Sequence, residues 1–225
     1  MPRNLTVSAL LPLLLFTPYS QAEASGKNKA PFDERQELAL ARSAAPQKIS
    51  EAASIWTLGH DGYERIVEGT NGFNCLVLRK WSAIFDDQRE LFDWDGLVAP
   101  ICYDPVASKG PMLEQFLRAK SGLEGDSHDE IKRAVYEAYV DGKLPTPIAV
   151  SFAYMYSSAQ KLSPNVGHWH PHLMVYAPYY DNSMLGGNAV SSGDPIVFEA
   201  PGTFRAIIAI PVDGREGHIS PEMTK

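Results

Sequence analysis

The order of hydrophobic and polar positions divides the chain into a helical start, a group of strands, a helical middle and a second group of strands. Residues 33–45 place apolar side chains at helical spacing behind Asp33, which can cap the first turn. After Pro46, residues 47–53 predict a second, shorter helix. Strand-like runs then cover residues 55–58, 63–68 and 73–81. Because Asp-Gly or Asn-Gly stands in each gap between these runs, we predict an antiparallel β-meander.

Two helices occupy the middle of the chain. The first covers residues 112–120 and pairs Glu114 with Arg118 one helical turn later. The second covers residues 127–141 and begins with a Ser-x-x-Glu capping box. Neither helix carries a recognisable catalytic motif, so we expect both to be structural.

The last third of the chain returns to strands. Strand-like patterns cover residues 148–156, 173–177, 196–199 and 203–212. Residues 206–210 are apolar at every position, which is typical of a strand in the interior of a sheet. Residues 177–195 form a long loop rich in Pro, Asn, Ser and Gly, and loops of that length are often functional.

These elements predict one α+β domain, a mostly antiparallel sheet with an N-terminal β-meander, packed by several helices. We divide the chain into a signal peptide at residues 1–24, an N-terminal helical segment at residues 25–54 and a single domain at residues 55–225. The signal peptide is indicated by a basic start, an apolar run and an A-x-A cleavage sequence. The apolar run is too short to span a bilayer, which needs about 20 residues. We expect a periplasmic or secreted protein with no membrane span in the mature chain; a retained N-terminal helix is the alternative.

Charge and cysteine content narrow the class of protein. The chain has 20 Lys and Arg against 27 Asp and Glu, a formal net charge of −7, and this balance argues against nucleic acid as a partner. Cys75 and Cys102 are its two cysteines, and in an oxidising compartment an isolated pair favours a disulfide. A catalytic thiol is the alternative, although the spacing provides no C-x-x-C motif.

Three histidines, His168, His170 and His172, fall within five residues, and imidazole is a common ligand for zinc and related metals. On an extended strand all three would project from one face, with neighbours about 6.5–7 Å apart and the outer pair about 13 Å apart. One ion could therefore bind two of them, with His170 and His172 favoured, unless Pro171 bends the chain. Histidines that are exposed on a loop, or that only hydrogen-bond to hold it, are the structural alternative.

A catalytic zinc site usually takes three protein ligands, so the histidine pair would need a third. The sequence does not rank the candidates, which are His60, His218, Asp181 and Glu199.

Aromatic residues are concentrated around the histidines. Phe152, Tyr154 and Tyr156 alternate and should share one strand face, and Trp169 and Tyr176 follow nearby. Aromatic side chains with polar tips can line a small-ligand site, for which we select Tyr154, Tyr156, Trp169 and Tyr176. The same residues can also form an ordinary core with hydroxyl groups at its rim.

Three function classes stay open on the sequence alone, and it does not decide whether the protein is an enzyme. The leading hypothesis is an exported domain that binds a small ligand or a metal ion, such as zinc, at the His/Tyr-rich segment. The second is a metal-dependent hydrolase that uses His170 and His172. The third is a cell-envelope protein-interaction module.

Several stretches of the chain resemble a group of uncharacterised bacterial exported proteins. They are EGTNGFNCLV at residues 68–77, PICYDP at 100–105, YMYSSAQ at 154–160 and WHPHLMVYAPY at 169–179. The resemblance covers most of residues 50–212 and implies export and a single domain. It assigns no activity, cofactor or catalytic residue to any position.

Overall fold

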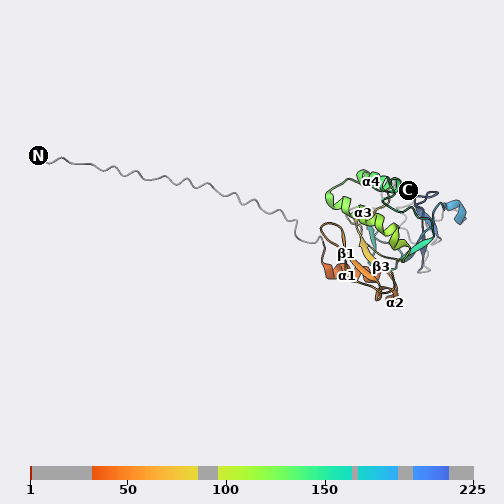
Figure 1. Ribbon diagram of the computed structural model, residues 1–225. Helices are drawn as coiled ribbons and strands as arrows, with labels where there is room; N and C mark the ends of the chain where they lie inside the picture. The colour runs from red at the N-terminus through yellow and green to blue at the C-terminus, as the bar shows by residue number, and fades with distance from the viewer. Residues whose placement is uncertain (2–31, 86–95, 164–166, 187–194, 213–225) are drawn as a thin grey trace.

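The computed structural model describes Met1 and residues 32–85, 96–163, 167–186 and 195–212 (Figure 1). The rest of the proposed signal peptide lies outside the described residues, as do His218 and part of the loop at 177–195. None of the described helices is both long enough and apolar enough to cross a membrane.

An eight-stranded mixed sheet forms the centre of the molecule, in the order β2-β1-β3-β4-β5-β8-β10-β9. Every neighbouring pair is antiparallel except β1 and β3. The α+β class with a mostly antiparallel sheet is therefore confirmed, and the apolar strand β10 lies in the interior as its sequence predicts. The strands are β1 (Ser54–Leu58), β2 (Tyr63–Val67), β3 (Asn74–Leu78), β4 (Ala99–Tyr103), β5 (Ser151–Met155), β8 (His172–Tyr176), β9 (Ile196–Glu199) and β10 (Ile207–Pro211).

The N-terminal meander is not confirmed. β1 and β2 form the expected antiparallel hairpin, but β3 lies on the other side of β1 and runs parallel to it. The connection from β2 crosses the start of β1, where Gly69 N donates to Ser54 Oγ and Thr70 N donates to Ala52 O. A Cβ on Gly69 would lie 2.2 Å from Ser54 N, so only glycine allows this close crossing. Gly69 therefore allows the chain to cross the start of β1 instead of forming a second hairpin turn.

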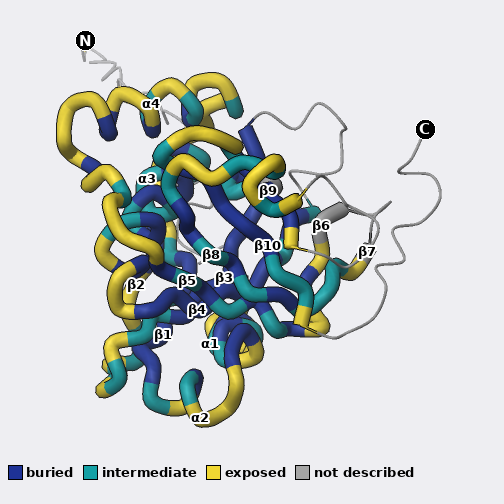
Figure 2. The backbone as a smooth tube through the Cα atoms, turned by 90° about the vertical axis from the view of Figure 1, so that its right-hand side faces the viewer, coloured by how far each residue is buried: buried dark blue, intermediate teal, exposed yellow. Residues whose placement is uncertain are grey.

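Helices cover the two faces of the sheet unequally (Figures 1 and 2). α3 (Pro111–Glu124) and α4 (His128–Val140) pack on one face, over the largest core cluster. α1 (Glu34–Ser43) packs on the other face against β1, β3 and β4, and α2 (Gln47–Ser50) follows it. A buried ion pair between Glu37 of α1 and Arg79, just after β3, helps to hold α1 there. The N-terminal helical segment is thus packed as part of the domain.

Local sequence signals account for both middle helices. α4 begins at Ser127, which forms the expected capping box with Glu130. α3 is longer than predicted, because it continues through Gly122 and ends at Gly125, whose φ of 96° suits glycine. A Cβ on Gly122 would lie 2.5 Å from Trp81, so the glycine inside the helix makes room for that ring.

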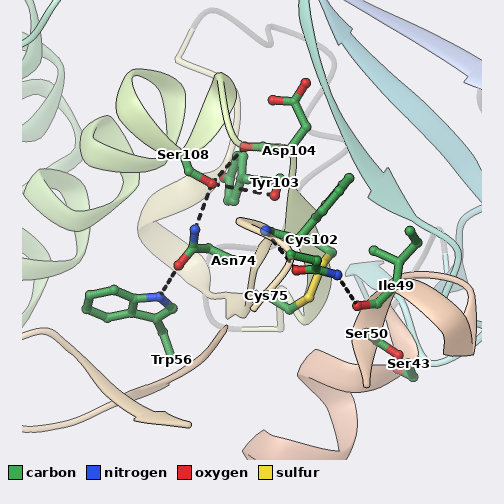
Figure 3. The surroundings of a disulfide bond; sticks show 12 residues. Ser43, Ile49, Ser50, Trp56, Asn74, Cys75, Cys102, Tyr103, Asp104 and Ser108 are labelled. Atoms are coloured by element: carbon green, nitrogen blue, oxygen red, sulfur yellow. Dashed lines mark hydrogen bonds between the residues drawn. A yellow bond between two sulfur atoms is a disulfide. The ribbon is translucent and has the colours of Figure 1, made fainter. Parts of the chain in front are cut away.

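The expected disulfide joins Cys75 of β3 to Cys102 of β4 (Figure 3). The two residues are direct partners in the strand register, and both are fully buried. Beside them, Trp56 Nε1 donates to Asn74 Oδ1 at 2.8 Å, and Asn74 Nδ2 donates to Ser108 Oγ at 3.0 Å. The bridge and these hydrogen bonds fasten β1, β3 and the short helix η2 (Ala107–Lys109) together.

Candidate functional site

The three clustered histidines do not lie on one straight strand. His168 belongs to β7 (Gly167–His168), which pairs with β6 (Lys161–Ser163) in a separate two-stranded ribbon. His172 begins β8 of the main sheet, so the chain changes course around Pro171. His168 is exposed, whereas His172 is 3% exposed. The segment is therefore not one extended strand, so the condition for a single histidine face is not met and the alternative of a bend near Pro171 applies.

Hydrogen bonds fix two of the imidazole rings. His172 Nδ1 donates to the carbonyl oxygen of His170 at 2.7 Å, and His168 Nδ1 lies 3.1 Å from the carbonyl oxygen of Gln160. Burial lowers the pKa of His172 to about 4, so this ring is neutral at pH 7. The Trp169 ring packs edge-on against His170 and His172, with centroids 5.8 and 6.4 Å away.

Within the described part of the chain, no three His, Cys, Asp or Glu side chains converge as a metal site. Two of the proposed third ligands have other partners: the Asp181 carboxylate caps the short helix η3 (Asn182–Leu185), and Glu199 pairs with two arginines. His60 lies in the β1–β2 turn, and His218 is outside the described residues. Zinc binding at His168, His170 and His172 stays a prediction, as does the hydrolase.

The four selected aromatic residues do not form one site. Tyr154 and Tyr156 lie beside Phe73 and Phe152 in a row of rings with centroids 5.0–6.2 Å apart, on the α1 side of the sheet. Tyr176 points to the opposite face, where it stacks on Tyr103, and Trp169 packs against the same core.

A buried cluster of four charged side chains lies at the end of the sheet where β9 finishes and β10 starts. Arg118 Nη2 lies 2.6 Å from Glu114 Oε1 and 3.3 Å from Glu199 Oε1. Arg205 Nη2 lies 2.7 Å and 2.8 Å from the same two oxygens. Glu114 and Arg118 come from α3, Glu199 from β9, and Arg205 from the turn before β10. Two carboxylates and two guanidinium groups give the cluster a formal charge of zero.

Neighbouring groups complete the environment of the cluster. Tyr139 Oη donates to Glu114 Oε2 at 2.8 Å, and the Phe85 ring lies 3.7 Å from the Arg118 guanidinium. Burial alone would raise the pKa of Glu114, but Arg118 and Arg205 outweigh it and hold that pKa at about 2. Burial raises the pKa of Tyr139, so its hydroxyl keeps the proton that it donates. The Glu114 carboxylate is thus ionised at neutral pH.

A small hollow opens beside this cluster. The centres of water molecules can occupy about 20 Å³ of it, which is room for one or two waters. Its walls combine apolar side chains with polar groups of the cluster: Pro111, Glu114, Gln115, Tyr139, Pro147, Tyr176, Glu199, Phe204, Arg205, Ala206 and Ile207.

Three polar groups around the hollow have hydrogen-bonding capacity left over. Gln115 Oε1 is buried and has no partner. Arg205 donates to the carboxylates from Nε and Nη2, and its Nη1 donates to no described residue. Glu199 accepts through Oε1, and its Oε2 accepts from no described residue. An acceptor, a cationic donor and an anionic acceptor are therefore available at one place.

This site is not apparent from the sequence, where Glu114 and Arg118 form a pair on a helix that is expected to be structural. One signal was present: Glu199 and Arg205 both closely precede the apolar residues 206–210, and charged groups seldom enter a core without partners. The identity of those partners was not readable, because they lie more than 80 residues away from Glu114 and Arg118.

Comparisons of this chain with protein-family models, with curated proteins and with solved structures gave no match. The resemblance to bacterial exported proteins therefore stays a prediction.

Proposed function

We propose that this protein is an exported domain that binds a small polar ligand in the hollow beside the buried ion cluster. The observation that carries the proposal is that Gln115, Glu199 and Arg205 line one hollow with apolar walls, and that each has a polar atom without a partner among the described residues. Ligand sites typically combine apolar walls with a few placed polar groups of this kind. A buried acceptor without a partner destabilises the free protein, and a ligand that donates to it would remove that penalty.

Export is the second part of the proposal. It is supported by the signal-like N-terminus and by the buried Cys75–Cys102 disulfide, which persists best in an oxidising compartment.

The test is a binding screen on the mature chain with small polar probes at 10 mM, among them amino acids, carboxylates, amides, amines and polyols. A probe present at 100 times its Kd adds about 2.7 kcal/mol of stability. For a chain of this size that corresponds to a Tm rise of about 5–10 °C. NMR amide shifts should centre on the residues around Gln115, Tyr139 and Arg205. If no probe raises the Tm or moves these signals, the proposal is wrong.

A matched pair of variants locates the binding. Gln115→Leu removes the unpaired acceptor and should weaken binding without loss of stability, because it also removes an unsatisfied buried group. Val140→Leu, at an 86% exposed position on α4, is the control and should bind as the unmodified chain does. Equal binding by both variants would place the ligand elsewhere.

The interaction module stays a second candidate because apolar side chains are exposed where β4 and β8 end and β5 begins. The most exposed are Ile148 at 94%, Val150 at 66% and Tyr179 at 62%. Exposed apolar groups near one another are typical of contact surfaces. Photo-crosslinkers placed in the cell at position 148, with position 140 as the control, test this candidate. One specific product from 148 alone would support it, and equal products from both would refute it.

A further inference from the structure

We infer that the ligand of the hollow is a small zwitterion with its ammonium and carboxylate groups close together, such as a free α-amino acid with a short side chain. This inference rests on the proposed function and adds the chemical class of the ligand. Three features support it: the polar atoms that have no partner among the described residues, the net charge of the ion cluster, and the chain segment at residues 145–150 beside the hollow.

The free atoms have opposite charges and lie on neighbouring groups. Arg205 Nη2 donates to Glu199 Oε1 at 2.8 Å, so Nη1 and Oε2, which have no partner among the described residues, belong to the two ends of one ion pair. A carboxylate is the natural acceptor for the guanidinium nitrogen, and an ammonium group is the natural donor for the carboxylate oxygen. Gln115 Oε1 adds a neutral acceptor for a further N–H of the same ammonium group.

The charge balance of the cluster favours a ligand with no net charge. Two glutamates and two arginines already neutralise one another, so a lone anion or cation would bring an uncompensated charge into a buried site. A zwitterion brings both charges together and leaves the balance at zero. We therefore expect the binding affinity to depend more on the presence of both charged groups than on the size of the ligand's side chain.

The cover of the hollow can move without breaking backbone hydrogen bonds. Pro147 forms part of the wall, and residues 145–150 make no backbone hydrogen bond to any described residue. Ile148 and Val150 of this segment point largely into solvent. Since the hollow holds only one or two waters, a ligand of amino-acid size enters by displacing this segment, whose residues other than Pro147 are exposed.

The experiment compares four matched probes on the mature protein: alanine, propionate, alaninamide and propionamide. They share a short carbon chain and carry, respectively, both charges, only the negative charge, only the positive charge and neither. Affinity is measured by calorimetry and by the Tm rise. We expect alanine to bind at least about tenfold more tightly than each of the other three, and Gln115→Leu to weaken alanine binding while Val140→Leu does not.

The outcomes separate this inference from the proposed function. Equal or tighter binding of propionate, alaninamide or propionamide at the hollow would overturn the zwitterion and leave small-ligand binding in place. Failure of all four probes overturns the inference, and the wider probe screen then decides the proposed function by itself.

Discussion

Removing the Arg205 guanidinium should destabilise the fold by about 3–5 kcal/mol, the range for breaking a buried ion pair. Its side chain is 5% exposed and donates to both oxygens of Glu114 and to Glu199 Oε1 at 2.7–3.1 Å. In Arg205→Met the apolar length of the side chain is kept, but these donors are lost. Among the described residues, Glu199 then retains only the 3.3 Å contact with Arg118.

A second substitution tests whether charge balance is the cause. Arg205→Met combined with Glu199→Leu leaves one carboxylate, Glu114, and one guanidinium, Arg118, which remain 2.6 Å apart. We expect this double variant to recover about 1–3 kcal/mol relative to Arg205→Met, since interacting buried charges give coupling energies of this size. Arg65→Met is the surface control: its 3.7 Å contact with Glu68 is exposed and should contribute less than about 1 kcal/mol.

Urea titrations at pH 7 measure all four proteins, with the m value checked for two-state unfolding. The reasoning is refuted if Arg205→Met lies within 1 kcal/mol of Arg65→Met, or if the double variant is less stable than Arg205→Met alone.

Three further predictions concern the rest of the fold. His172 has a folded pKa of about 4 against an unfolded value of 6.5, so stability should fall by up to about 3 kcal/mol as the pH drops from 6.5 to 4; urea titrations across that range should show a flatter dependence for His172→Gln. Replacing Cys75 and Cys102 by alanine should lower the free energy of unfolding by about 3–4 kcal/mol, given a sequence separation of 27 residues, and an unchanged urea midpoint would contradict this. Gly69→Ala should lower the Tm markedly because its Cβ would overlap β1, whereas Gly110→Ala, with open space around the added atom, should not; similar Tm values would refute the crossing geometry.

Elements defined by neighbouring residues were predictable from the sequence. The capping box of α4, the β1–β2 hairpin and the apolar strand β10 each depend on a few adjacent positions, and the structure confirms them. The disulfide was also predictable, because a chain with two cysteines has one intramolecular pairing available.

Features that depend on distant partners were not predictable. The Asn-Gly loop before β3 is compatible with a hairpin or with a crossing, and the choice depends on Ser54 and Ala52 on another strand. The histidine face assumed an extended chain, but the course around Pro171 separates His168 from His172. The ion cluster joins α3 to segments more than 80 residues further on, and no single-sequence pattern encodes that distance.

The position of the disulfide in the strand register has a consequence for assembly of the sheet. Cys75 and Cys102 face each other only when β3 and β4 are correctly aligned, and a shift of one residue would turn one thiol to the opposite face. A disulfide can therefore form when β3 and β4 are in the correct register, but not after a shift of one residue. The covalent bond therefore favours the correct register in the middle of the sheet, in the strand pair next to the boundary between β4, the last strand from the first half of the chain, and β5, the first from its second half.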